Sequence, residues 1–327
     1  MDKGLASLLE WTWSYRVGRV LHVANGLGVF EALAEGPLDA LTLARRTGTD
    51  AGMLERLLIA CCGMGLLRRS AGRYENTETA DRYLVPGRPL YQGDIIAHGA
   101  SVWSFWDRLE SVVREGPRQG PPARDPEQHR RFILGMDNIT MAGRGRLFLD
   151  HVDLSGRKRL FDVGGGPGTY SILACRKWPE LQAVVFDVPE TVAIAAERIA
   201  ADGLADRIRT QVGDWDTDEF GEGNDVVLFS NVLHGPGSSA EQKLAKAYRS
   251  LVPGGLVVIQ EFLLDDDKNG PLVPALFNVM VGAFSRGELM NLVRGAGFVD
   301  VRVVAHDETL GSTWLTAFKP PMDADND

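Results

Sequence analysis

The sequence predicts an α/β chain: a mainly helical first half, followed by a doubly wound, largely parallel sheet that ends in an antiparallel hairpin. Three observations predict this. Apolar residues recur at three- and four-residue steps near the N-terminus, short β-branched runs alternate with helical segments from Arg159 onward, and two alternating runs joined by a turn at Glu308–Gly311 close the chain. These patterns are typical of amphipathic helices, of parallel sheets with crossover helices, and of hairpins.

The chain divides into parts with different sequence patterns. Its 327 residues exceed one average domain, so each half can bury its own core. In the first half, two short helical patterns flank the turn Thr47–Asp50 and a polar turn follows at Ser70–Arg73, which is the outline of a winged helix. A Pro/Gly-rich loop at 116–126 interrupts the later helices. We expect a winged-helix-like domain over 1–95, a helical linker or lid over 96–150, the sheet domain over 151–320 and a tail over 321–327.

Composition and charge argue against several classes of protein. The net charge is -9, and residues 36–84 hold seven basic against six acidic side chains, whereas a nucleic-acid binder needs a basic face. No apolar run approaches the ~20 residues that cross a bilayer, and Glu10, Arg16 and Arg19 interrupt the N-terminal segment, which has no clean apolar signal. The three cysteines give neither a disulfide framework nor zinc-ligand spacing. We expect a cytoplasmic protein with a small-molecule partner, no nucleic acid, no membrane and no metal.

A glycine-rich turn follows the first predicted strand. The strand ends at Phe161–Val163, and Gly164, Gly166 and Gly168 precede the next helix. Glycines there let the backbone pass close to a ligand at the carboxyl ends of the strands. Their spacing departs from the G-x-G-x-x-G of dinucleotide-binding folds. The glycines therefore indicate a ligand and leave its identity to other positions.

Two further positions extend this ligand site. Asp187 ends the second predicted strand, where a carboxylate can accept hydrogen bonds from both ribose hydroxyls; this serves NAD and S-adenosylmethionine equally. The third strand delivers Asp214 and Trp215, a carboxylate that can accept from an adenine amino group and an aromatic face that can stack on the ring. Together they predict a cofactor that contains a nucleoside.

These parts occur in a defined order: Asp162 and the glycines, Asp187, Asp214–Trp215, Pro253–Gly255 and the terminal hairpin. In this order they resemble the class I S-adenosylmethionine-dependent small-molecule O-methyltransferases, which have a Rossmann-like sheet. The helical first half, with the segments WSFWDRLESVVREG and FILGMDNITM, is similar to the bacterial natural-product and plant phenolic enzymes of this class, whose N-terminal winged-helix domain forms an intertwined dimer. The resemblance covers residues 10–320 and implies a homodimer, the cofactor S-adenosylmethionine and a role in secondary metabolism.

The resemblance also implies a cofactor pocket. Its residues lie at the ends of the first four predicted strands. They are Asp162, Gly164 and Gly166 at the methionine part, Asp187 and Val188 at the ribose, Gly213, Asp214 and Trp215 at the adenine, and Ser230 and Asn231 closing the pocket.

By the same resemblance His234, after the fourth strand, is the general base. An imidazole with an unperturbed pKa of ~6.5 can take a proton near neutrality. Glu261, at the end of the fifth strand, matches the family's acidic partner, which hydrogen-bonds the histidine and orients its ring. The sequence departs from the family where Gly235–Ser239 replaces an Asp-Trp pair and a later Asp, and where Ala283 replaces a glutamate of the plant enzymes.

The acceptor pocket is predicted from aromatic, sulfur-containing and amide side chains, for which packing in a helix core or a dimer interface is an equal alternative. They are Trp103, Trp106, Met136, Met141, Asn278, Met280 and Phe284. The expected reaction is attack of a hydroxyl of an aromatic or polyketide-like metabolite on the sulfonium methyl. C- or N-methylation, a non-methylating enzyme with the same cofactor, and a winged-helix regulator remain alternatives because fold does not dictate reaction.

Overall fold

The computed structural model describes residues 2–116 and 125–322 and divides into two compact units, Met1–Ile139 and Thr140–Asp327. Each unit is described by itself. The division between Ile139 and Thr140 assigns the segment expected as one linker or lid, 96–150, partly to each unit. Most of the predicted loop at 116–126, and the end of the predicted tail, lie outside the described residues.

The N-terminal unit begins with the elements of a winged helix. Asp39 and Asp50 start two of its helices: their side chains accept hydrogen bonds from the backbone N–H of Thr42 and Met53, both at 2.8 Å. The predicted turn Thr47–Asp50 separates these helices, and the predicted turn at Ser70–Arg73 joins two antiparallel strands. The elements are α1 (Lys3–Gly26), α2 (Val29–Ala32), β1 (Leu38–Asp39), α3 (Ala40–Thr47), α4 (Ala51–Gly63), β2 (Leu67–Ser70), β3 (Arg73–Asn76) and α5 (Glu78–Leu84), with strand order β1-β3-β2.

Four more helices complete this unit. They are α6 (Gly93–Ser101), α7 (Trp103–Asp107), α8 (Leu109–Glu115) and α9 (Pro126–Ile139). The buried Asn138 of α9 accepts hydrogen bonds from the backbone N–H of Asp94 and Ile95 at the start of α6, at 3.1 and 3.2 Å. Asn25 of α1 donates to the Gly93 carbonyl at 3.0 Å. The side-chain amides of a half-buried and a buried asparagine thus fasten α1 and α9 to the same end of α6.

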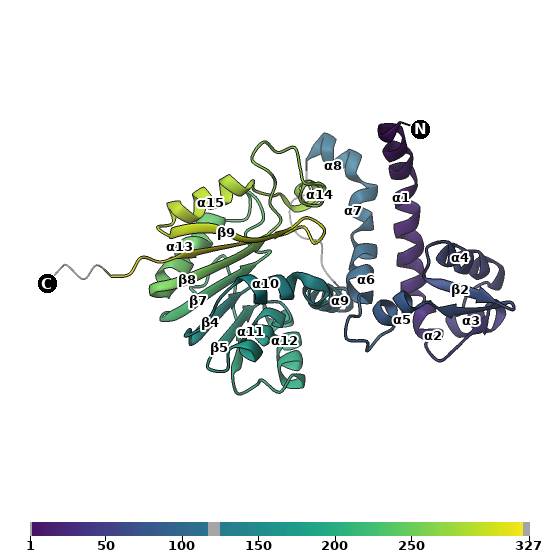
Figure 1. Cartoon of the computed structure of the whole chain (residues 1–327), viewed down its shortest axis with the longest axis horizontal. Coiled ribbons are helices and arrows are strands. Elements are labelled where there is room, and N and C mark those ends of the chain that lie inside the picture. The colour runs from purple at the N-terminus through teal and green to yellow at the C-terminus, as the bar shows by residue number, and fades with distance from the viewer. Residues whose placement is uncertain (1, 117–124, 323–327) are drawn as a thin grey trace. The chain divides into compact units, whose positions relative to one another are not determined.

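The C-terminal unit is built on a sheet of seven strands in the order β6-β5-β4-β7-β8-β10-β9 (Figure 1). The strands are β4 (Arg159–Val163), β5 (Gln182–Asp187), β6 (Ile208–Val212), β7 (Asn224–Ser230), β8 (Leu251–Glu261), β9 (Val299–Asp307) and β10 (Ser312–Phe318). Strands β4 to β8 are parallel, and β10 runs antiparallel to both β8 and β9. The predicted runs and terminal hairpin are therefore confirmed.

Helices cover both faces of this sheet. Leu244 and Leu289 bring α13 (Ala240–Ser250) and α15 (Arg286–Gly295) into one apolar core, while Phe148, Ile172 and Ile199 bring α10 (Gly145–His151), α11 (Thr169–Lys177) and α12 (Pro189–Ala201) into a second. Figure 1 shows these two groups on opposite sides of the sheet. The remaining helices of the unit are the π-helix η1 (Thr140–Arg144) and α14 (Leu272–Val281).

The strand order places a ligand site. From β4, strands β5 and β6 are added on one side and β7 and β8 on the other, so the chain crosses over between β6 and β7. The connections after β4 and β7 therefore leave toward opposite faces of the sheet. In open α/β sheets, ligands bind at the carboxyl ends of the strands at such a switch point. Within 2–116 and 125–322, no helix combines the length and apolarity that crossing a membrane requires.

Candidate active site

The loop after β4 runs from Gly164 to Gly168 and leads into α11. Gly164 and Gly166 have φ values of +63° and +56°, a conformation that L side chains rarely adopt. A Cβ on Gly164 would lie 2.6 Å from the Trp215 ring, whereas a Cβ on Gly166 would point into open space with no atom within 4 Å. The loop thus packs tightly on one side and leaves room for a ligand on the other.

Asp187 lies beside this loop at the end of β5. Its carboxylate accepts hydrogen bonds from the backbone N–H of Gly166 at 3.0 Å and of Val188 at 2.8 Å. Both donors are backbone groups, and a carboxylate is the kind of acceptor that ribose hydroxyls can use. The predicted ribose residues are therefore held against the glycine loop by the backbone itself.

Asp162 lies beneath the loop, at the end of β4. Burial raises the pKa of its carboxyl to about 7, against the opposing effect of the Ser171 hydroxyl, which donates to Oδ2 at 2.7 Å; the charge of Asp187 raises it further. A Cβ on Gly165 would lie 2.8 Å from the Asp162 carboxyl carbon. Asp162 therefore supports the loop from below.

The loop after β6 holds Gly213, Asp214 and Trp215. Glycine is required at 213, because a Cβ there would lie 2.1 Å from the ring of Phe186. Asp214 is exposed and accepts a hydrogen bond from the Asp216 N–H at 2.8 Å. Trp215 is half-buried and lies against Gly164. The predicted adenine residues therefore adjoin the glycine loop.

The end of β7 is fixed by its neighbour β8. The Ser230 hydroxyl donates to the Gln260 side-chain oxygen at 2.8 Å, and the Asn231 N–H donates to the Gln260 carbonyl at 2.9 Å. Asn231 has a φ of +54°, which turns the chain out of the sheet and toward His234. Both residues predicted to close the pocket lie at the carboxyl end of the sheet.

His234 and Glu261 meet after the adjacent strands β7 and β8. Imidazole Nδ1 lies 3.4 Å from Glu261 Oε2; the Glu261 side chain is fully buried, whereas 32% of the His234 side chain is exposed. Glu261 Oε1 accepts a hydrogen bond from the Leu233 N–H at 2.7 Å, which fixes the carboxylate. The predicted pair is therefore held together in the structure, with the carboxylate behind the ring.

The protonation of His234 reflects three influences. Burial works to lower its pKa, contact with the negative charge of Glu261 raises it, and the ammonium of Lys243 lowers it. The net result is a pKa above the ordinary value of 6.5. His234 is therefore a stronger base than a free imidazole.

The departure at Gly235 has a steric cause. A Cβ at this position would lie 2.8 Å from both the Ala283 nitrogen and the Gly282 carbonyl carbon. The Phe284 N–H donates to the His234 carbonyl at 3.2 Å, which keeps the two segments together. Gly235 and Ala283, the two positions at which this chain departs from the family, therefore pack against each other.

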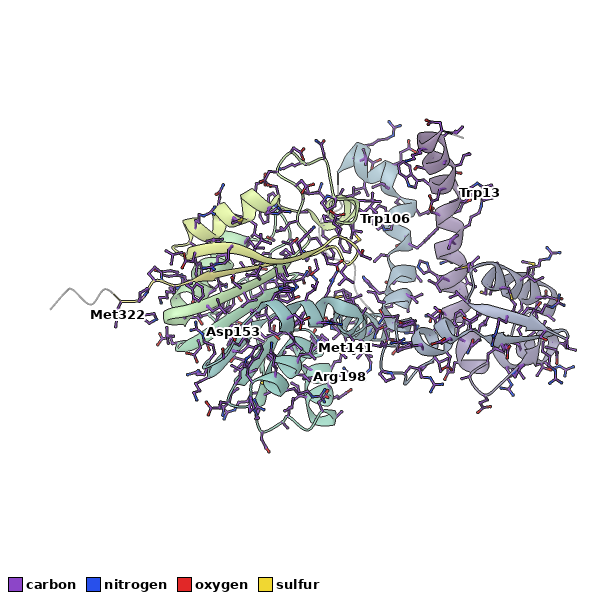
Figure 2. All side chains as sticks on the ribbon, viewed as in Figure 1. Trp13, Trp106, Met141, Asp153, Arg198 and Met322 are labelled. Carbon is purple, nitrogen blue, oxygen red and sulfur yellow. The ribbon has the colours of Figure 1, made fainter. Side chains whose placement is uncertain are left out.

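The residues predicted for the acceptor pocket are divided between the units. Trp103, Trp106 and Met136 belong to the N-terminal unit, and Met141, Asn278, Met280 and Phe284 to the C-terminal unit. Met141 is exposed (Figure 2). Phe284, by contrast, is buried in the apolar core shared with α13 and α15, and the Asn278 side chain accepts a hydrogen bond from the Ala283 N–H at 2.9 Å, closing the end of α14. The structure gives these last two residues packing and capping contacts.

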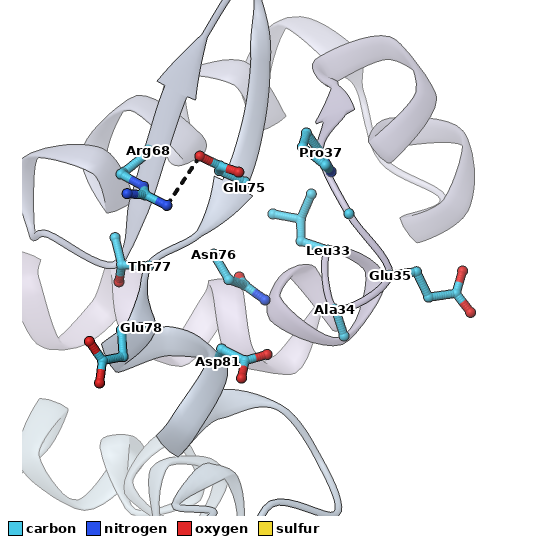
Figure 3. Close-up of a pocket in the computed structure, with 11 residues that line it drawn as sticks. Leu33, Ala34, Glu35, Pro37, Arg68, Glu75, Asn76, Thr77, Glu78 and Asp81 are labelled. Atoms are coloured by element: carbon cyan, nitrogen blue, oxygen red, sulfur yellow. Dashed lines mark ion pairs between the residues drawn. The ribbon is translucent and has the colours of Figure 1, made fainter.

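A separate cavity of about 420 Å³ lies in the N-terminal unit (Figure 3). It lies between the end of α2, strand β3 and the start of α5, and it is lined by Glu35, Glu78 and Asp81 and by an ion pair of 3.3 Å between Arg68 and Glu75. It contains none of the predicted site residues. We therefore assign the chemistry to the strand ends of the C-terminal unit.

Sequence reasoning missed two lysines next to this site. Lys243 and Lys246 of α13 are both buried, and both contact the loop that holds Trp215. A signal was available, because Lys243 lies three residues after the core residue Ala240 and four before Ala247, and Lys246 follows Lys243 by another three-residue step, on the buried side of the helix. A lysine at such a position needs a partner, since a buried charge is costly when unpaired.

Comparison with known proteins identifies the family. Residues 117–299 match the family model of the O-methyltransferase domain, and residues 9–86 match that of the O-methyltransferase dimerisation domain. The chain is 39% identical over 304 residues to 3-hydroxy-5-methyl-1-naphthoate 3-O-methyltransferase of Streptomyces sahachiroi, covering 88% of this chain and 87% of that protein. It is 32% identical over 327 residues to acetylserotonin O-methyltransferase of Bos taurus, covering 92% and 94%.

The fold agrees with these sequence matches. The structure of human N-acetylserotonin methyltransferase in complex with S-adenosylmethionine superposes with a TM-score of 0.87 at 28% identity, covering 98% of this chain and 99% of that chain. The bound molecule in that structure is the cofactor that the sequence predicted. The predicted fold class and the predicted kind of enzyme are confirmed: the chain belongs to the O-methyltransferase family and carries both its methyltransferase domain and its dimerisation domain.

Proposed function

We propose that the protein transfers the methyl group of S-adenosylmethionine to a hydroxyl of a small aromatic or polyketide-like acceptor. The observation that carries this proposal is the grouping of an open glycine loop, the Asp187 carboxylate and the His234–Glu261 pair at the carboxyl ends of adjacent parallel strands. The naphthoate substrate in the name of the Streptomyces relative supports an aromatic acceptor.

The residues present fit the cofactor. The open space above Gly166 admits a ligand close to the backbone, Asp187 offers acceptor oxygens for ribose hydroxyls, and Trp215 offers an aromatic edge beside the loop. When bound, S-adenosylmethionine supplies a methyl group already made electrophilic by its sulfonium. The chain therefore has to hold the acceptor, exclude water and manage one proton.

His234 takes that proton. With Nδ1 directed at Glu261, the tautomer that carries hydrogen on Nδ1 leaves Nε2 free to accept the acceptor's hydroxyl proton. The buried carboxylate of Glu261 then offsets the positive charge of the imidazolium and keeps the ring in orientation. The acceptor oxygen would bond to the methyl carbon as its O–H bond breaks, the bond from that carbon to sulfur would break with its electron pair remaining on sulfur, and S-adenosylhomocysteine would leave. The proton would then pass from the exposed part of the His234 ring to solvent.

Methyl transfer is tested with the intact chain. We expect calorimetry to show micromolar binding of S-adenosylmethionine and none of NAD, and deuterated methyl cofactor to label a hydroxynaphthoate or another phenol in an acceptor panel. Mass and NMR analysis of the product distinguishes an oxygen from a carbon or nitrogen position. Cofactor binding without O-methylation of any phenolic acceptor would contradict the proposed acceptor class, and preferential binding of NAD would contradict the function itself.

We further propose that the enzyme is a homodimer formed through the N-terminal unit and that it acts in the cytoplasm in secondary metabolism. Helix α1 supports the dimer, since its side chains Trp11 and Trp13 are 62% and 60% exposed and lie on a helix whose buried residue is Ala24. Figure 2 shows Trp13 on this helix. Such an apolar surface is typical of an interaction site. The unpaired thiols of Cys61, Cys62 and Cys175 support a reducing compartment.

If α1 forms the dimer interface, substitutions on α1 should lower the mass of the particle in solution. The double change Trp11→Glu and Trp13→Glu introduces like charges into an apolar interface, so the particle should fall from two 35.7 kDa chains to one in light scattering after size exclusion. Met322→Glu alters an even more exposed apolar side chain, in the other unit, and should leave the mass unchanged. A wild-type protein that is monomeric at micromolar concentration would refute the proposal.

A further inference from the structure

Lys243 of α13 is a buried lysine with partners on two separate loops. Its residue exposure is 3%, and its ammonium donates to the Ser238 carbonyl at 2.5 Å. The same group lies 3.2 Å from the Asp216 carboxylate and 5.1 Å from the centre of the Trp215 ring. One ammonium thus joins the loop after β6 to the loop after β7.

In the loop after β7, two hydrogen bonds connect Ser238 to the segment that holds His234. The Ser238 hydroxyl donates to the Leu233 carbonyl, and the Leu233 N–H donates to Glu261 at 2.7 Å. Ser238 is therefore fixed to the residue before His234, and Glu261 is fixed to the same residue. A shift of Ser238 would move the peptide that positions the imidazole.

Lys246, one turn along α13, provides an internal contrast. Its exposure is 5%, and its ammonium donates to the carbonyls of Trp215 and Asp218 at 2.8 and 2.9 Å. Both partners belong to the loop after β6. Lys246 therefore fastens that loop alone, whereas Lys243 fastens it to the histidine loop.

We propose that Lys243 is a positioning residue that links the adenine side of the cofactor pocket to the general base and places a fixed positive charge near His234. The proposal rests on the proposed function for the role of His234. Two charged groups act on the pKa of His234: Glu261 from β8 raises it, and Lys243 from α13 lowers it.

Substitutions distinguish the role of Lys243 from that of Lys246. Lys243→Met keeps the length of the side chain and removes its charge, so the midpoint of the His234 titration should rise, because the influence that lowers its pKa is gone. The Kd for S-adenosylmethionine should rise about tenfold as the Trp215 loop loosens. Lys246→Met should raise the Kd similarly and leave the titration unchanged. Lys243→Arg should restore the titration midpoint toward the wild-type value.

The measurement is NMR of histidine ring carbons against pH, assigned with a His234→Gln variant, together with calorimetry of S-adenosylmethionine binding. An unchanged His234 midpoint in folded Lys243→Met, or an equal shift in Lys246→Met, would overturn the proposal. If Lys243→Met does not fold, Asp216→Asn carries the test, since removing this exposed counter-charge should lower the His234 midpoint; an unchanged midpoint would overturn it. Wild-type protein that titrates as expected but methylates no acceptor would refute the proposed function and leave this coupling standing.

Discussion

Replacing His234 with asparagine should lower kcat/KM for methyl transfer by about 10²- to 10⁴-fold, the usual contribution of a positioned general base. Asparagine can still hydrogen-bond but cannot take a proton near neutrality. Because the pocket for the cofactor lies at the glycine loop and Asp187, the Kd for S-adenosylmethionine should stay within about threefold of wild type. Steady-state kinetics and calorimetry on the same preparations check both expectations.

His306 supplies a matched control for this variant. It lies on β9, where its ring contacts the Thr313 hydroxyl at 2.9 Å, and His306→Asn should leave kcat/KM unchanged. In the wild type, kcat/KM should rise with pH through a midpoint above 6.5, because the base must be neutral and its pKa is raised. In Glu261→Gln the midpoint should move down, since the negative charge that raises the pKa is lost. Full activity in His234→Asn would remove the histidine from the mechanism.

The second large effect is expected at Asp187. Asp187→Asn keeps the shape of the side chain but replaces one acceptor oxygen with a donor that faces backbone N–H groups or ribose hydroxyls. Losing one acceptor oxygen and the negative charge of a buried carboxylate should weaken S-adenosylmethionine binding by about 100-fold. Calorimetry measures the loss directly, and saturating cofactor should recover much of kcat.

The control for this loss is Asp202→Asn. Asp202 follows α12 in the same unit and pairs with Arg176 away from the glycine loop, so cofactor affinity should not change. Thermal unfolding of both variants separates a binding defect from a folding defect. If Asp187→Asn binds S-adenosylmethionine as tightly as wild type, the ribose assignment is wrong and the cofactor is held by other groups.

The sequence predicted those parts of the protein that depend on local pattern. Strands β4 to β8 stand out because each is a short β-branched run, and the ends of parallel strands necessarily share one edge of the sheet. The pairing of His234 with Glu261 came instead from the family resemblance, and the adjacency of β7 and β8 explains why the two side chains meet. The residues predicted for the cofactor pocket lie at or just after strand ends, so a pattern of strands was enough to place them at one edge of the sheet.

Other features depend on how the helices pack in three dimensions, which a local sequence pattern specifies only in part. Phe284 was predicted to line the acceptor pocket, and the sequence pattern did not indicate that it also packs in the core with α13 and α15. Lys243 and Lys246 were passed over because lysine usually points to solvent, and only the position of the Trp215 loop reveals their partners. The reason for glycine at 235 likewise lies in a distant segment, Gly282–Ala283.

The contact between Gly235 and the Gly282–Ala283 backbone also constrains how this enzyme can evolve. A lineage that regained an aspartate after the histidine would first have to move the end of α14 away, since even a methyl group at 235 meets backbone atoms at 2.8 Å. Backbone gives way less readily than a flexible side chain. The two positions are therefore expected to change together across descendants, and an engineer who grafts the family's Asp-Trp pair onto this scaffold should redesign both segments in one step.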